Sequence, residues 1–153
     1  MIVEVDQSGK LERTSIPTVV SYSNSKSKAV IINSNEKRKL QEYFRSIEKR
    51  RVYIYQCFAI LIFMLIKDEK DISKLTIDTE YPGQEPLIKN YLLNLLQTQT
   101  ISKLTKSEII FKSIGKKSHA HEIAYKTYRG ELKCVATTAK EVLSYIQENK
   151  KSG

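Results

Sequence analysis

The stretch KLTIDTEYPG, residues 74–83, places two carboxylates directly after a short apolar run. The run from Leu75 to Ile77 predicts a buried strand, and Asp78 and Glu80 follow it. Pro82-Gly83 predicts a turn, after which an amphipathic helix is expected. A strand of this kind carries acidic side chains to the carboxyl edge of a sheet, where open α/β sheets build their sites. The rest of the chain is expected to supply partners for Asp78.

Three further strands are predicted upstream of this stretch, in residues 2–6, 18–22 and 29–32. Their close spacing predicts an antiparallel meander. A helix is expected from Glu36, because apolar residues then recur at helical spacing. Neither glycine nor proline interrupts the sequence up to Ile66, so this helix is expected either to continue that far or to break near Arg51 and restart.

Helices and strands are expected to alternate downstream of residue 83. The predicted elements are a helix over 86–96, a strand over 109–114, a helix from His119, a short extended piece over 132–136 and a helix over 139–147. The sequence therefore predicts an α/β fold with a mixed five-stranded sheet, in which three antiparallel strands precede parallel ones and helices flank the faces. We expect a single domain over residues 1–148 and a polar tail over 149–153.

The chain carries a large excess of positive charge. Its 153 residues include 26 lysines and arginines against 17 acidic residues, which gives a formal net charge of +9 at pH 7. This excess favours a polyanionic partner, nucleic acid first, although lysines that only solvate the protein are an alternative. The candidate phosphate contacts are Lys10, Lys37, Arg38, Lys116 and Lys117. The last two fall in a predicted loop before a helix N-terminus, a natural position for a phosphate contact. A loop that is merely solvated is an equally good interpretation of these two lysines.

The cysteines and the apolar segments bear on location. Cys57 and Cys134 are distant and do not make a disulfide framework, and the N-terminus lacks the features of a signal peptide, so we expect a cytoplasmic protein. The apolar run over residues 52–66 contains Gln56 and is short for a membrane span, which favours a buried helix. If exposed, this run would offer a homodimer surface. Membrane insertion of the run is a weaker alternative.

Two acidic residues fall at the ends of predicted strands. Asp6 ends the first strand, and Asp78 ends the fourth. If these strands are neighbours, their carboxylates meet, and paired carboxylate oxygens are ligands that Mg²⁺ or Mn²⁺ prefers. Two such ions assist phosphodiester cleavage by stabilising the attacking and leaving oxygens. The alternative is that both are ordinary turn or cap aspartates.

Three short motifs, taken in order, resemble the ribonuclease H-like superfamily of nucleases. The first is Val5-Asp6-Gln7-Ser8-Gly9, an acid on the first strand before a small-residue turn. The second is Ile77-Asp78-Thr79-Glu80-Tyr81, which matches a Thr-Asp-Ser-like motif at the end of the fourth strand. The third is Ala120-His121-Glu122-Ile123-Ala124, which matches an Ala-Asp-Glu-Leu-Ala-like motif with His121 in the acid's place, as in resolvases of the RuvC type.

The resemblance covers residues 1–130 and implies a metal-dependent nuclease of that fold. It implies Asp6 and Asp78 as Mg²⁺ or Mn²⁺ ligands and catalytic residues, with His121 as a third ligand or a group that orients water. Active ribonucleases H also carry a glutamate early in the first helix, where this chain has Lys39, with Glu36 and Glu42 about one turn away. A catalytically inactive module that binds nucleic acid or assists assembly is therefore the second hypothesis.

Other interpretations of the same residues stay open. His119 and His121, with Cys57 and Cys134, have the ligand types for zinc but lack the spacing of a structural site. His121 is alternatively a plain surface residue at a helix start. Glu122 is expected on the solvent side of its helix. Glu80 would share the strand face of Asp78 if the strand continued that far, but the Pro82-Gly83 turn follows closely, which makes Glu80 a possible bystander.

Overall fold

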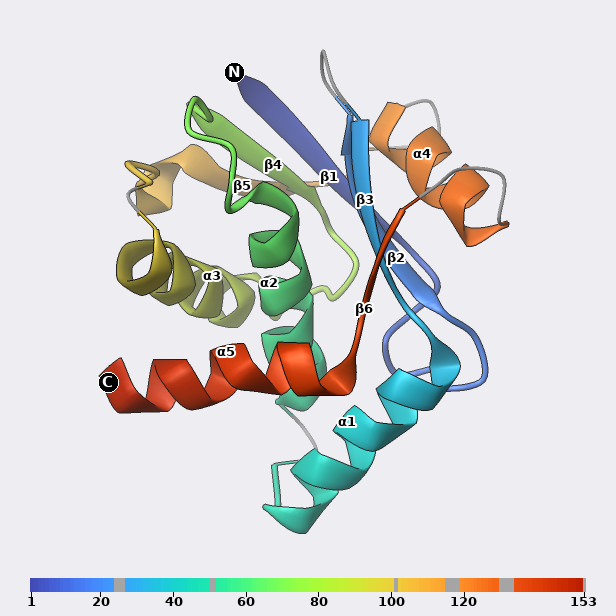
Figure 1. Ribbon diagram of the computed structural model, residues 1–153. Coiled ribbons are helices and arrows are strands. Elements are labelled where there is room, and N and C mark those ends of the chain that lie inside the picture. The colour runs from blue at the N-terminus through green and yellow to red at the C-terminus, as the bar shows by residue number, and fades with distance from the viewer. Residues whose placement is uncertain (24–26, 50–51, 101, 115–118, 130–133, 153) are drawn as a thin grey trace.

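A computed structural model describes residues 1–23, 27–49, 52–100, 102–114, 119–129 and 134–152 (Figure 1). Its centre is a six-stranded sheet with the order β5-β4-β1-β2-β3-β6. The strands are β1 (Ile2–Ser8), β2 (Thr18–Ser23), β3 (Ser27–Ile32), β4 (Lys74–Asp78), β5 (Ile109–Lys112) and β6 (Val135–Thr137). The prediction of five strands is wrong by one, because the extended piece near residue 135 joins the sheet as β6.

The sheet is mixed, as the sequence predicts. Strands β1, β2 and β3 pair antiparallel, whereas β1 with β4, β4 with β5, and β3 with β6 pair parallel. Because β1 and β4 are parallel neighbours, their carboxyl ends meet at the same edge of the sheet. This topology positions the candidate site.

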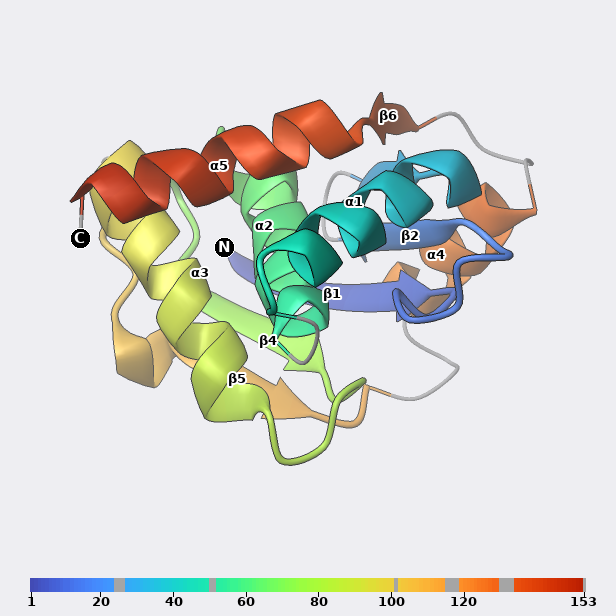
Figure 2. The ribbon, with the colours of Figure 1, turned by 90° about the horizontal axis from the view of Figure 1, so that it is seen from below.

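Helices cover both faces of the sheet (Figures 1 and 2). They are α1 (Ser34–Ser46), α2 (Tyr53–Ile66), α3 (Glu85–Gln99), α4 (His119–Tyr128) and α5 (Ala139–Ser152), with a short 3₁₀ turn, η1, at Lys106–Glu108. Helix α4 packs on β1, β2 and β3 from one side, and α2 lies against β2 and β3 from the other, with α3 and α5 packed on α2. Helix α5 continues to Ser152, so the predicted tail is helical over 149–152.

The helix predicted after β3 is broken into two. Helix α1 ends at Ser46 and α2 begins at Tyr53. Glu48, between them, has a φ angle of 60°, in the left-handed region that cannot continue a right-handed helix. Of the two alternatives left by the sequence, the break near Arg51 is therefore the observed one.

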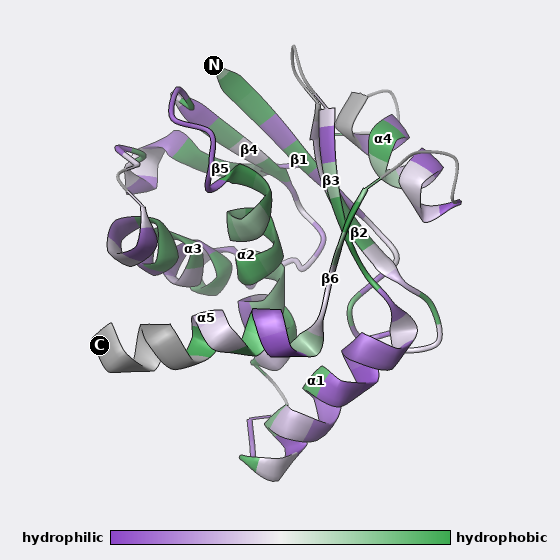
Figure 3. Cartoon of the chain, viewed as in Figure 1, coloured by the Kyte–Doolittle hydropathy of each residue, from purple (hydrophilic) through white to green (hydrophobic). Residues whose placement is uncertain are grey.

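Helix α2 forms the centre of the hydrophobic core and is apolar along most of its length (Figure 3). Each residue from Cys57 to Ile66 is at most 7% exposed. The exposure on which a homodimer surface in this run depended is therefore not found over residues 57–66, because the sheet, α3 and α5 cover them. Among the described residues, no helix is long and apolar enough to cross a membrane.

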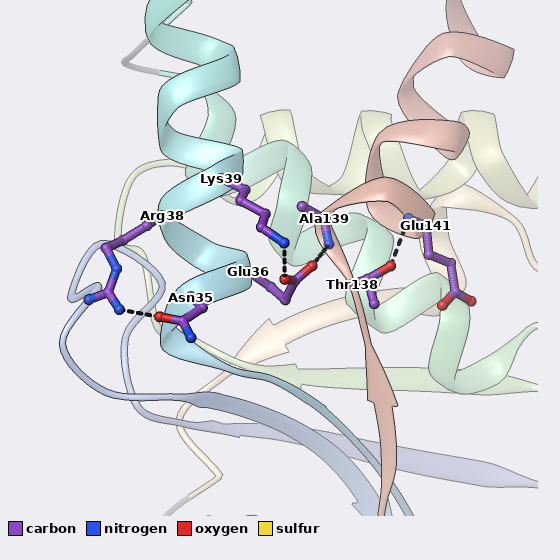
Figure 4. A network of polar contacts seen from close by, with 7 residues as sticks. All are labelled: Asn35, Glu36, Arg38, Lys39, Thr138, Ala139 and Glu141. Atoms are coloured by element: carbon purple, nitrogen blue, oxygen red, sulfur yellow. Dashed lines mark hydrogen bonds and ion pairs between the residues drawn. The ribbon is translucent and has the colours of Figure 1, made fainter.

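A polar link joins α1 to the start of α5 (Figure 4). The backbone N–H of Ala139 donates to Oε1 of Glu36 at 3.0 Å, and Nζ of Lys39 donates to Oε2 of the same carboxylate at 2.8 Å. Thr138 accepts a hydrogen bond from the N–H of Glu141 at 3.2 Å. Glu36 thus satisfies a backbone donor in the first turn of α5, and the bond from Lys39 holds the pKa of its carboxyl below the usual value.

Gly9, just after β1, is required by the path of the chain. It has a φ angle of +77°, and a Cβ atom there would lie 2.1 Å from the carbonyl oxygen of Pro17. We expect Gly9→Ala to lower the free energy of unfolding by roughly 3 kcal/mol, through the strained φ and the backbone clash. Urea unfolding followed by circular dichroism measures this loss.

Gly83→Ala is the matched control, because Gly83 has a φ angle of +87° but no atom within 4 Å of the added Cβ. This variant is expected to lose only about 1 kcal/mol, from backbone strain alone. Equal losses in the two variants would show that the contact with Pro17 contributes nothing.

Candidate metal centre

Asp6 and Asp78 lie side by side on adjacent parallel strands. Val5 of β1 pairs with Ile77 of β4, and both are fully buried on the core face of the sheet. Side chains alternate between the faces of a strand, so the next residues, Asp6 and Asp78, both face away from α2. Asp6 is only 3% exposed. The predicted meeting of these two carboxylates is confirmed.

Glu80 joins them, which corrects the expectation that it is a bystander. The N–H of Thr79 donates to the carbonyl of Lys112 at 3.2 Å, so the chain continues beside β5 for one more step before it turns. Glu80 therefore returns to the same side as Asp78. One carboxylate oxygen each from Asp6, Asp78 and Glu80 lies within 4.8 Å of the other two.

Backbone donors orient two of the three carboxylates. The N–H of Gln7 donates to Oδ1 of Asp6 at 2.8 Å. The N–H of Ile114, just after β5, donates to Oδ1 of Asp78 at 2.8 Å. These bonds fix the direction in which each carboxylate presents its remaining lone pairs.

His121 approaches the cluster from α4. Its Nδ1 lies 2.8 Å from Oδ2 of Asp6, so the imidazole and the carboxylate form a hydrogen bond across the space between α4 and β1. His121 is thus not a plain surface residue. The closely spaced oxygens belong to Asp6, Asp78 and Glu80, and His121 is bonded to the first of these carboxylates.

The three carboxylates and His121 line one open cavity of about 270 Å³. Gln7, Thr79 and Ser113 complete its lining. A cavity of this size admits a small ion together with part of a larger substrate. No family model, curated protein or solved structure matches this chain. What the site can do has to be inferred from its own groups.

The charges of the cluster oppose one another. Burial raises the pKa of Asp6, and the charge of Asp78 raises it further, against the hydrogen bonds from Gln7 and His121. Burial also raises the pKa of Glu80, to about 8, together with its hydrogen bond to Asp78 and the charges of Asp78 and Asp6. Ionisation of all three carboxylates at such short separations costs free energy unless a cation compensates their charge. Their hard oxygen atoms fit Mg²⁺ or Mn²⁺, which both prefer such ligands.

The predicted basic contacts have different positions. Lys10 is exposed, and its Nζ lies 5.9 Å from the centre of the Tyr81 ring, next to Glu80 in the chain. Arg38 is exposed on α1 and donates to Asn35. Lys116 and Lys117 lie outside the described residues. The prediction that Lys37 contacts phosphate is wrong. Lys37 is 2% exposed, and its ammonium is already bonded to backbone carbonyls, so it is not a surface phosphate contact.

The acids of α1 do not reach the cluster. Glu36 bonds to Ala139 and Lys39, and Glu42 is exposed on α1. Lys39, which stands where the resemblance calls for a glutamate, pairs with Glu36. Among the described residues, Glu80 is the third acid of the cluster, and no acid of α1 is part of it.

Two smaller predictions are settled by the same geometry. Glu122 is exposed and pairs with Lys126 at 2.7 Å, as expected for the solvent side of α4. The zinc interpretation is wrong for Cys57, because this residue is 1% exposed in the core on the α2 side of the sheet, whereas His121 lies on the α4 side. Burial raises the pKa of the Cys57 thiol to about 12.

Proposed function

We propose that this protein binds nucleic acid and hydrolyses phosphodiester bonds at the Asp6, Asp78 and Glu80 cluster, with Mg²⁺ or Mn²⁺ bound there. The observation that carries the proposal is the convergence of three carboxylate oxygens within 4.8 Å of one another at the carboxyl edge of two parallel strands. Acids that serve only in structural ion pairs lie beside lysine or arginine side chains of the protein. These three acids instead line an open cavity.

Each group then has a definable role. Asp6, Asp78 and Glu80 would hold the cation. A cation held there would supply Lewis acidity toward a phosphate and would make water more acidic. His121 holds Oδ2 of Asp6, and the N–H groups of Gln7 and Ile114 hold the Oδ1 atoms of Asp6 and Asp78, so little reorganisation is needed when the substrate arrives.

The charge of the chain supports a nucleic acid substrate. The net charge is +9, although the site itself is acidic, so the positive charge lies elsewhere on the surface and is suited to a long polyanion. Lys10 is exposed, and its Nζ lies 5.9 Å from the centre of the Tyr81 ring. A substrate strand would contact such cations with its phosphates while one phosphodiester occupies the cavity.

We further propose that the fold is ribonuclease H-like. Three antiparallel strands, a helical segment, a parallel strand, a helix, a parallel strand and a helix follow in the order that the resemblance implies. Two features depart from it: a second helix, α2, precedes β4, and the unit β6–α5 is added at the far edge of the sheet.

A catalytically inactive nucleic acid-binding module is the second candidate. The observation that favours it is the position of Glu36 and Glu42, which leaves the cluster without an acid from α1. Under this alternative the fold and the basic surface are kept, and the cluster has no turnover.

A cleavage panel tests the proposal. Purified protein is incubated with an RNA–DNA hybrid, a four-way DNA junction, single-stranded DNA and single-stranded RNA, each with Mg²⁺, Mn²⁺ or EDTA. We expect cleavage of at least one substrate with a cation and none in EDTA. Binding measured by fluorescence anisotropy is expected to weaken steeply with salt, because neutralised phosphates release counterions. Binding without cleavage would favour the inactive module, and no binding at low salt would contradict both.

A further inference from the structure

Lys37 is buried beneath the loop that joins β1 to β2, residues 9–17. Its Nζ donates to the carbonyl oxygens of Lys10 at 2.9 Å, Arg13 at 2.7 Å and Ile16 at 2.8 Å. An ammonium has three donors, so all of them are used on this one loop. Burial lowers the pKa of Lys37 to about 8, which still leaves the group mostly protonated at pH 7.

Tyr81 holds the same loop from the opposite side. The backbone N–H of Leu11 donates to the Tyr81 hydroxyl at 3.3 Å, and Nε2 of Gln7 donates to it at 3.0 Å. Phe58 and Tyr55 of α2 contact the Tyr81 ring edge-on and keep it in place. The loop is therefore fixed between α1 and the segment that follows β4.

This double attachment fixes the backbone at Lys10 and at the residue that follows it. The carbonyl of Lys10 is bonded to Lys37, and the next N–H, that of Leu11, is bonded to Tyr81. The Lys10 ammonium lies over the Tyr81 ring, whose residue directly follows Glu80. Gln7, bonded to the same tyrosine, lines the cavity. The exposed Lys10 is thus connected to the lining of the cavity through Tyr81 and Gln7.

We propose that Lys37 is a positioning residue for nucleic acid binding: it fixes the loop so that Lys10 contacts a phosphate of the strand that enters the cavity. This inference rests on the proposed function. Lys37 acts through Lys10 and touches no substrate itself, which replaces the direct phosphate contact expected from its sequence position. Lys37→Met keeps the apolar stem and removes the three donors.

A double-mutant cycle in the full chain tests this coupling. Lys10→Gln and Lys37→Met are each expected to weaken binding of a fluorescent single strand by roughly three- to tenfold at low salt. The double variant is expected to be no weaker than Lys10→Gln alone, because the second change removes only the support of a contact already lost. Lys103→Met, an exposed lysine at the end of the sheet remote from the cavity, is the charge control and should change binding little.

A second measurement separates this inference from the proposed function. Mn²⁺ affinity, measured by electron paramagnetic resonance, should be unchanged in Lys37→Met, since none of the three carboxylates contacts Lys37. If Lys37→Met does not fold, Tyr81→Phe removes the support of Leu11 and should show the same non-additivity with Lys10→Gln. If the wild type binds nucleic acid but the losses of affinity in Lys10→Gln and Lys37→Met multiply in the double variant, only the role proposed for Lys37 would be overturned. A wild type that binds no nucleic acid would overturn the proposed function and this inference together.

Discussion

Asp78→Asn is expected to reduce metal-dependent cleavage by about a thousandfold or more, because one of the three proposed carboxylate ligands loses its charge. Asp78 ends β4 at the centre of the cluster, and its Oδ1 accepts the N–H of Ile114. Asparagine has nearly the same shape, and its side-chain oxygen can accept the same hydrogen bond. The change therefore removes charge at the site while keeping the backbone path. Initial rates of cleavage at saturating Mn²⁺ measure the effect.

The control for this prediction is Asp68→Asn, an exposed acid in the connection between α2 and β4. It changes the net charge equally and should leave the rate unchanged. Melting temperatures in EDTA should show Asp78→Asn to be as stable as the wild type or more stable, since it relieves repulsion with Asp6 and Glu80. Wild-type turnover in Asp78→Asn would rule out the cluster as the site of hydrolysis.

The meeting of Asp6 and Asp78 could be predicted because it depends on strand periodicity. Once β1 and β4 are neighbours, the apolar residues Val5 and Ile77 must face the core, and the acid that follows each must face the other side. His121 beside Asp6 was predicted only through the resemblance to a family. Its own helix pattern gives no reason to place it against β1.

Glu80 was underestimated because the turn at Pro82-Gly83 suggested that the strand ended at Asp78. The bond from Thr79 to Lys112 extends the pairing by one residue, and this bond depends on where β5 ends. The two-residue interval between Asp78 and Glu80 was the available signal, since that interval returns a side chain to the same face. This interval alone indicates Glu80 as the third acid of the cluster.

The prediction that Lys37 contacts phosphate was wrong for a different reason: it rested on the charge of the side chain and not on its position in the helix. Lys37 lies three residues before Leu40 and seven before Phe44, so it falls on the buried stripe of α1. This spacing indicates a buried lysine, although its three carbonyl partners belong to a loop that the sequence does not place. Strand β6 was missed as a sheet member because only three residues form it, and Val135 within it is exposed.

The second large effect is expected in the stability of the metal-free protein, which should fall as the pH rises from about 4.5 to about 8 through the contribution of Glu80. The folded protein holds a proton on Glu80 over this range, whereas the unfolded chain has already lost it, so each step upward in pH favours unfolding. This contribution is complete below pH 4.5 and absent above pH 8. We expect a loss of about 2–4 kcal/mol, or about 5–10 °C in melting temperature, in EDTA.

Glu80→Gln isolates this contribution, because glutamine keeps the shape of the side chain and does not titrate. In EDTA, the difference in melting temperature between wild type and Glu80→Gln should widen from pH 5 to pH 8, with the wild type the less stable. Saturating Mg²⁺ or Mn²⁺ should reverse this at pH 8, because a cation that binds only the folded carboxylates stabilises that state. A constant difference across this pH range, unaffected by either cation, would mean that Glu80 is an ordinary surface acid and that the three carboxylates hold no metal.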